Sequence, residues 1–141
     1  MNLEFIQELW DKDSIIDTEL LHNESTKIPA LHAKYYKIYN NILTLKKAQE
    51  TQYKILKKEK WQYYTGKASP EVYVEKPFDF KVLKADLDKY FDADADIIKC
   101  TAKIEYQQIM LEYLESILKV ISNRTYQIKN AIEWQRFTNG L

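Results

Sequence analysis

The sequence of 141 residues contains one cysteine, two glycines and three prolines. Because Cys100 has no second cysteine to pair with, an internal disulfide is excluded, and a reducing compartment fits this usage. Disordered chains are poor in apolar residues, whereas 45% of the residues here are apolar. The composition therefore predicts a folded chain, and the length suits a single domain with a modest core.

Long apolar runs are also missing. No stretch approaches the ~20 apolar residues that a helix needs to cross a bilayer. The first residues, MNLEFIQELWDKD, are acidic and amphipathic, with no basic leader before an apolar run, so we expect no secretion signal. These features predict a cytosolic protein without membrane contact.

Groups that support catalysis are scarce. His22 and His32 lie ten residues apart, which is not a metal-ligand spacing. No glycine-rich phosphate loop is present, and no histidine is paired with a plausible serine or cysteine nucleophile. We therefore expect no catalytic residues, no cofactor and no enzymatic activity.

Three alternating aspartates, Asp92, Asp94 and Asp96, resemble the first half of a calcium-binding loop. Such a loop needs glycine where Ile97 stands and a glutamate where Lys103 stands, so the pattern fails. The aspartates are better explained as a linker and as an N-terminal cap, where their charge favours the start of the next helix. We expect no metal site here.

Two long stretches without glycine or proline predict an all-α fold. Apolar residues recur at helical spacing from Ala30 to Tyr64, and again from Asp96 to Asn139. Shorter helices are expected after an Asn2 cap, from Asp17 to a break near Pro29, and from Phe80 to Tyr90. Gly66 to Phe80 is predicted to be a loop, in which residues 72–74 form a brief strand-like piece. The single domain then divides into N-terminal helices (1–67), a loop with a short helix (68–95) and a C-terminal helix (96–139).

The C-terminal helix carries a heptad seam beside a second apolar stripe. One antiparallel partner helix cannot cover two apolar faces, so the pattern indicates coiled-coil-like self-association through this helix. The core of an intramolecular bundle is the equally supported alternative. The candidate oligomerisation residues are Ile104, Leu111, Leu114, Leu118, Ile121, Ile128 and Ile132.

Charge is balanced overall, at 21 basic and 21 acidic residues, but it is sorted along the chain. Residues 1–24 hold seven acids against one lysine, whereas residues 46–67 hold seven lysines against two acids. A neutral chain with a local basic stripe favours a defined nucleic-acid groove over general adhesion. The acidic start is a candidate surface for contact with another protein, although solvated acids on a short helix are the commoner explanation.

The end of the first long helix combines lysines with aromatic residues. Lysines can follow a phosphate backbone, while aromatic rings offer platforms for unpaired bases, so the pattern is typical of a single-strand binder. A solvated lysine face whose rings belong to the core is the competing interpretation, and Trp61 fits both. The candidate DNA-binding residues are Lys54, Lys57, Lys58, Lys60, Trp61, Tyr64 and Lys67.

Several segments resemble the UvsY family of recombination mediators from T-even-like bacteriophages. Residues 58–67, KEKWQYYTGK, are similar to the family's basic-x-basic-x-x-Tyr-Tyr-Ser/Thr-Gly-basic segment, and residues 82–86, VLKAD, follow in the same order. Near the end, Arg124, Ile128-Lys129, Arg136-Phe137 and Gly140 keep a similar spacing. The colinearity of these segments over nearly the whole chain carries the resemblance more than any one motif does.

The resemblance implies a recombination mediator that binds single-stranded DNA coated by a phage single-strand DNA-binding protein and helps a RecA-like phage recombinase to load. It implies roles in recombination, recombination-dependent replication and repair, in the cytoplasm of the infected host. It also implies a ring-like homo-oligomer, a heptamer with a hexamer as the alternative. Lys58 and Lys60 match the family's DNA-contacting pair, but lysine replaces the family's common arginine at Lys60 and Lys67 and so loses the planar fork. The competing function is an α-helical homo-oligomeric assembly protein without a specific DNA role.

Overall fold

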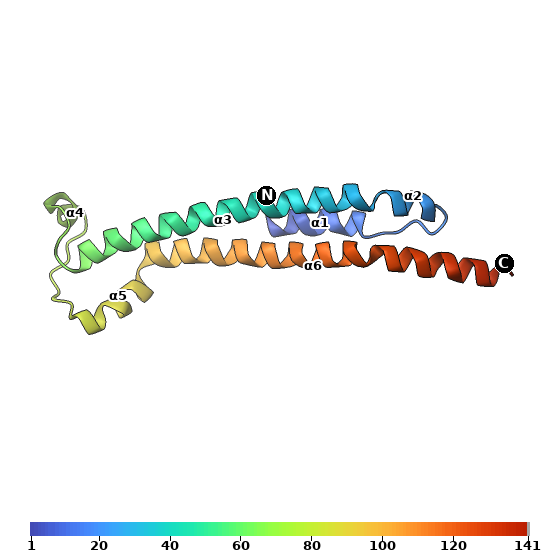
Figure 1. The fold of residues 1–141 in the computed structure, drawn as a ribbon. Helices are drawn as coiled ribbons and strands as arrows, with labels where there is room; N and C mark the ends of the chain where they lie inside the picture. The colour runs from blue at the N-terminus through green and yellow to red at the C-terminus, as the bar shows by residue number, and fades with distance from the viewer. Residues whose placement is uncertain (141) are drawn as a thin grey trace. The chain divides into compact units, whose positions relative to one another are not determined.

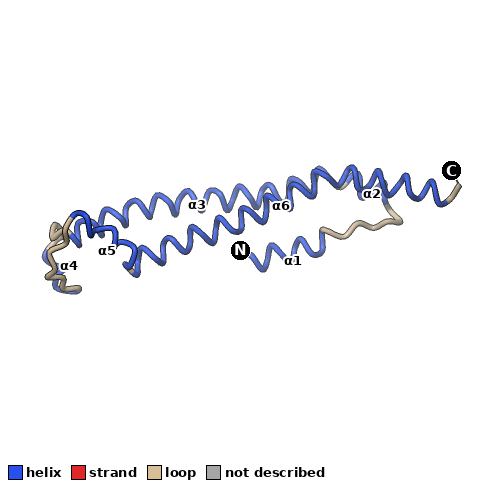
Figure 2. Tube along the Cα trace, turned by 90° about the horizontal axis from the view of Figure 1, so that it is seen from below, coloured by secondary structure: helices blue, strands red, loops and turns tan. Residues whose placement is uncertain are grey.

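The computed structural model describes residues 1–140 and confirms the all-α prediction. Figure 2 shows helices joined by loops, and no strand occurs among these residues. The α-helices, labelled in Figure 1, are α1 (Leu3–Asp13), α2 (Leu21–Thr26), α3 (Ile28–Tyr64), α4 (Pro70–Glu75), α5 (Leu87–Ala93) and α6 (Ala95–Thr138). A 3-10 turn, η1 (Lys84–Asp86), precedes α5.

The start of α1 is capped as predicted, since Oδ1 of Asn2 accepts a hydrogen bond from the amide of Phe5. The second helix is shorter than predicted. Asp17 accepts from the amide of Glu19 in a local turn, and α2 begins only at Leu21. Pro29 then lies in the first turn of α3, where a missing N–H costs no intrahelical bond.

The long helices confirm the expectation from the scarcity of glycine and proline. α3 runs for 37 residues and α6 for 44 residues. Gly66, with φ +76°, ends the first of them: the amide of Lys67 donates to the Gln62 carbonyl and that of Gly66 to the Tyr63 carbonyl. This pair of bonds is a Schellman motif, which needs a residue such as glycine in the left-handed region.

The strand-like prediction for residues 72–74 is wrong, because these residues lie in α4. Pro70 stands in the first helical turn after Ser69, which favours helix initiation, and the described residues 1–140 offer no second strand for pairing. The helix predicted from Phe80 also starts late. Residues 84–86 form a 3-10 turn, and α5 begins at Leu87.

The contacts divide the chain into two units, one of residues 1–43 and 109–141 and one of residues 44–108. In the first unit, α1 and the early part of α3 pack on the late part of α6 around a core of nine buried residues. These are Ile6, Tyr35, Ile38, Ile42, Met110, Leu111, Leu114, Ile117 and Ile121. Apolar burial over three helices supplies most of the stability of this unit.

The candidate seam residues of α6 differ in their burial. Leu111, Leu114, Ile121 and Ile128 are at most 3% exposed within the chain itself. Leu118 packs against the same core, and Ile104 is half-buried in the second unit. Only Ile132, at 39%, keeps a large exposed surface. The intramolecular alternative therefore accounts for most of the seam, because the same chain already covers these side chains.

In the second unit, the late part of α3 packs with α4, α5 and the early part of α6. Cys100 is buried here, and its Sγ lies 3.3 Å from Nε2 of Gln49. Across residues 1–140, no helix is both long enough and apolar enough to span a membrane. The basic end of α3 belongs to this second unit.

Candidate nucleic-acid interface

The late part of α3 exposes a lysine face. Lys54, Lys57 and Lys58 are all exposed, and Trp61 follows them on the same side of the helix with 39% of its surface accessible. Among residues 1–140, neither Lys54 nor Lys58 has an ion-pair partner. Both ammonium groups are therefore free to meet an external anion.

Trp61 lies at the surface rather than in the core. The Nζ atom of Lys67 sits 4.4 Å from the centroid of its ring, which is a cation–π contact. The Schellman motif at Gly66 turns the chain so that Lys67 reaches back over α3. Lys67 and Trp61 thus place a positive charge and an aromatic ring side by side.

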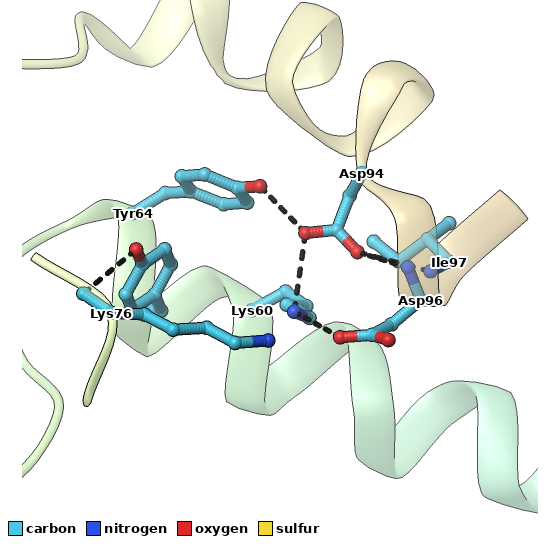
Figure 3. A network of polar contacts seen from close by, with 7 residues as sticks. Lys60, Tyr64, Lys76, Asp94, Asp96 and Ile97 are labelled. Atoms are coloured by element: carbon cyan, nitrogen blue, oxygen red, sulfur yellow. Dashed lines mark hydrogen bonds and ion pairs between the residues drawn. The ribbon is translucent and has the colours of Figure 1, made fainter. Parts of the chain in front are cut away.

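Lys60 differs from the other lysines, since its side chain is only 16% exposed. Its Nζ lies 2.7 Å from Oδ2 of Asp96 and 3.3 Å from Oδ2 of Asp94 (Figure 3). Burial alone would lower the pKa of Lys60, but the hydrogen bonds to Asp96 and Asp94 raise it above its ordinary value. The chain's own carboxylates therefore neutralise this lysine, which the sequence pattern grouped with the exposed ones.

Asp94 is the centre of this network. Its Oδ1 accepts from the amides of Asp96 and Ile97, so it caps α6 as predicted, and its Oδ2 accepts from the Tyr64 hydroxyl at 2.6 Å. Burial would raise the pKa of Asp94, but the bonds from Tyr64, the Ile97 amide and Lys60 lower it. The same environment, chiefly burial and then the bond to Asp94, raises the pKa of Tyr64. One carboxylate thus joins the end of α3 to the start of α6.

Tyr64 also belongs to an aromatic cluster that the sequence pattern did not reveal. Its ring centroid lies 5.2 Å from that of Phe78, 5.4 Å from Tyr90 and 6.2 Å from Phe91. Tyr63 joins at 5.3 Å from Phe78. The spacing of Tyr90 and Phe91 on α5 marked them only as apolar helix positions. What unites the rings is the folding of α5 and the 76–80 segment onto the end of α3.

The described part of the chain contains no candidate metal site, since no three histidine, cysteine or acidic side chains come together there. Asp94 and Asp96 both pair with Lys60, and Asp94 also caps α6. The chemistry that this surface offers is anion and ring binding.

Comparison with known proteins decides what kind of protein carries this surface. Residues 9–141 match the family described as "Recombination, repair and ssDNA binding protein UvsY". The chain belongs to the UvsY family. Within it, the sequence is 26% identical over 140 residues to the recombination protein uvsY of Enterobacteria phage T4, covering 99% of both chains.

Solved structures of a UvsY protein share the fold. One crystal form of the bacteriophage T4 recombination mediator protein UvsY superposes with a TM-score of 0.87 at 26% identity, covering 99% of this chain and 98% of that one. A second crystal form gives a TM-score of 0.84 at 25% identity, with 94% and 97% covered. The resemblance read from residues 58–67 and the later segments is thereby confirmed at the level of the family, whose members are single-stranded DNA-binding proteins of phage recombination and repair.

Proposed function

We propose that this protein is a recombination mediator that binds single-stranded DNA along the exposed lysine face of α3. In that role it promotes the loading of a RecA-like phage recombinase onto DNA coated with phage single-strand DNA-binding protein. Membership of the UvsY family supports the function, and the free ammonium groups of Lys54 and Lys58 support the site. The protein hydrolyses no nucleotide itself and acts in the cytoplasm of the infected host.

The predicted site residues divide into two groups in this proposal. Lys54, Lys57 and Lys58 contact phosphates, and Trp61 with Lys67 offers a ring and a charge to the strand. Lys60 and Tyr64 hold the end of α3 in place through Asp94. A direct contact between Lys60 and DNA requires its release from both aspartates, which a phosphate can replace as an anionic partner.

The same proposal includes assembly: copies of the chain associate through α6 into a ring, which is either a heptamer or a hexamer. Because the core already covers Leu111, Leu114 and Ile121, the contact uses the apolar residues that α6 exposes toward its C-terminal end. Tyr126, Trp134 and Phe137 are 65–76% exposed, and the last two rings stack at 6.0 Å. Residues 1–67 then carry the DNA-binding helix end, 68–95 the connection and 96–139 the oligomerisation helix.

Assembly matters to affinity because one subunit neutralises few phosphates. The salt dependence of binding to a single strand has a slope of about −0.7 per phosphate contacted, so a lone subunit binds weakly at physiological salt. Repeating the lysine face around a ring offers several sites to one strand at a high effective concentration. Binding is therefore expected to strengthen with oligomerisation.

Fluorescence anisotropy with a labelled oligonucleotide tests the site. The parent should bind with an affinity that falls as salt rises, and Lys54→Ala/Lys58→Ala should weaken binding and flatten the slope by about 1.4 for each subunit that engages the strand, at about 0.7 per lost contact. Lys37→Ala is the matched control, because it removes an exposed lysine of α3 in the other unit. If binding changed neither with salt nor with the loss of both lysines, the competing function, a homo-oligomeric assembly protein without a specific DNA role, would describe the chain better.

A further inference from the structure

Aromatic rings line a hollow beside the end of α3. It has a volume of about 540 Å³ and is lined by Tyr63, Tyr64, Phe78, Lys89, Tyr90 and Ala93. The rings that form it are close neighbours, with Tyr64 and Tyr90 centroids 5.4 Å apart and Phe78 and Tyr90 centroids 5.8 Å apart. A hollow walled by rings suits a flat aromatic guest, since stacked and edge-to-face contacts both favour such a guest.

Two of these rings are fixed in place through their hydroxyl groups. The Tyr64 hydroxyl donates to Asp94 at 2.6 Å, and the Tyr63 hydroxyl donates to the backbone carbonyl of Lys76 at 3.0 Å. Figure 3 shows Tyr64 held against Asp94, which in turn is held by Lys60. Rings that are already ordered lose little rotamer freedom when a guest stacks on them.

The acidic and basic side chains of α5 line different hollows, and the basic one lines the aromatic hollow, which favours an anionic ligand there. Asp88 and Asp92 line a different hollow, together with Phe91, on another side of this short helix. Lys89 is the one charged side chain among those that line the aromatic hollow, and it is 80% exposed. Its nearest acid, Asp86, lies 3.3 Å away as an exposed ion pair, which a phosphate can displace at little cost.

A second groove shares the wall formed by Tyr63. It measures about 550 Å³, and Lys60, Lys67 and Lys76 line it with three acids, Glu59, Glu75 and Asp96. Asp96 forms an ion pair with Lys60. The other two cations of this groove, Lys67 and Lys76, lie outside that ion pair. Tyr63 therefore borders a groove that contains lysines and a hollow that contains aromatic rings. These two surfaces complement the two parts of a nucleotide, since lysines bind a phosphate and rings stack on a base.

We propose that the hollow formed by Tyr63, Tyr64, Phe78 and Tyr90 receives one unstacked base of the bound single strand, whose neighbouring phosphates lie at Lys67, Lys76 and Lys89. This inference rests on the proposed DNA-binding function and adds a base-holding site to it. Holding a base out of the stack would bend the strand at each subunit. Because every base has a π-face, such a site tolerates any sequence.

Filling the hollow tests the inference without removing a ring. Ala93 lines the hollow and is exposed, so Ala93→Leu adds bulk there at little risk to folding. Ala85→Leu makes the same change at an exposed alanine that does not line the hollow, and serves as the control. Each protein is titrated by anisotropy with oligo(dT) and with an oligomer of equal length in which abasic sugars replace the bases.

The parent should bind oligo(dT) at least about tenfold more tightly than the abasic oligomer, since one stacked base alone is expected to contribute about that much. Ala93→Leu should narrow the difference between the two affinities by weakening oligo(dT) alone, and Tyr90→Leu should do the same, while stacking on Trp61, which lies outside the hollow, keeps part of the preference. A strand carrying 2-aminopurine should lose fluorescence on binding the parent and lose less with Ala93→Leu. Ala85→Leu should match the parent in all three measurements.

Two results would overturn the inference and leave the proposed function intact. In the first, the parent binds both oligomers equally while Lys54→Ala/Lys58→Ala weakens both, which makes the phosphate backbone the only ligand. In the second, Ala93→Leu leaves the preference for oligo(dT) unchanged, which means that the base sits elsewhere or that the hollow serves another partner. Failure of the parent to bind either oligomer would instead defeat the proposed function itself.

Discussion

Nζ of Lys60 lies 2.7 Å from Oδ2 of Asp96, a residue 36 positions later in the chain. The same ammonium group also meets Asp94, so one lysine of the matched pair is held by the fold while Lys58 faces solvent. Two lysines that look equivalent in the sequence therefore have different roles. Replacing Lys60 should chiefly lower the stability of the fold, whereas replacing Lys58 should chiefly weaken DNA binding.

Lys60→Ala is expected to lower the free energy of unfolding by about 1–3 kcal/mol, because it leaves the Asp94 side chain, only 5% exposed, without its cation. Lys58→Ala should change stability by less than about 0.5 kcal/mol, since Lys58 is exposed and has no ion-pair partner within residues 1–140. Urea denaturation followed by circular dichroism measures both. Equal stabilities for the two variants would show that the ion pairs of Lys60 contribute nothing.

The network should also weaken in acid. The lowered pKa of Asp94 in the folded state means that its contribution is present above its unfolded value, about 3.9, and is lost as pH falls through the folded pKa. The parent should therefore exceed Asp94→Asn in stability at pH 7, by about 1–3 kcal/mol. The difference should shrink steadily below pH ~4, as shown by thermal melts across that range. For Lys60 the pH dependence runs the other way, because its pKa is raised in the folded state. Its contribution to stability is fully present below its unfolded pKa, about 10.4, and is lost as pH rises above that value.

Asp92→Asn supplies the control for that comparison, because it removes an exposed carboxylate that lies outside the network. It should remain close to the parent at pH 7. If the gap between the parent and Asp94→Asn stayed constant down to pH 3, a lost contact of the neutral side chain would explain it, and the charge of Asp94 would not.

Arg124 should hold α1 in the first unit. Its Nη2 donates to the backbone carbonyls of Asp13 at 2.8 Å and Ser14 at 3.1 Å, and the side chain is 3% exposed. Arg124→Met is expected to lower the free energy of unfolding by about 1.5–3 kcal/mol, the range for hydrogen bonds from a charged group. Arg136→Met, at an exposed position of α6, should have little effect. Limited proteolysis in residues 14–20 should speed up for Arg124→Met alone, and unchanged cleavage would contradict the assignment.

The proposed assembly calls for substitutions that leave the core alone. Leu114 is fully buried, so Leu114→Glu should unfold the first unit and cannot test self-association. Trp134→Ala/Phe137→Ala removes two exposed rings instead, and should lower the mass seen by sedimentation while helix content and Tm measured on the dissociated chain stay the same. Val74→Ala, at an exposed apolar residue of α4, is the control. A parent that sediments as a monomer at all concentrations would refute assembly.

Much of the fold was determined by local chemistry. The scarcity of glycine and proline fixed α3 and α6, Asn2 and Asp94 supplied caps, and Gly66 ended α3, because each of these depends on neighbours within a few residues. The exposed face of Lys54, Lys58 and Trp61 follows from helical spacing alone. Helix α4 does not follow from the sequence, because three apolar residues carry too little periodicity to distinguish a helix turn from a strand.

Tertiary structure decided what these elements do. Spacing places Lys58 and Lys60 on one helix end, but only the approach of Asp94 and Asp96 from the start of α6 neutralises one of them. The heptad seam predicts an apolar face, but only the packing of α1 and α3 shows that Leu111, Leu114 and Ile121 are covered within the chain. Helical periodicity reports which side of a helix is apolar or basic, whereas the partner that meets that side depends on contacts between distant residues.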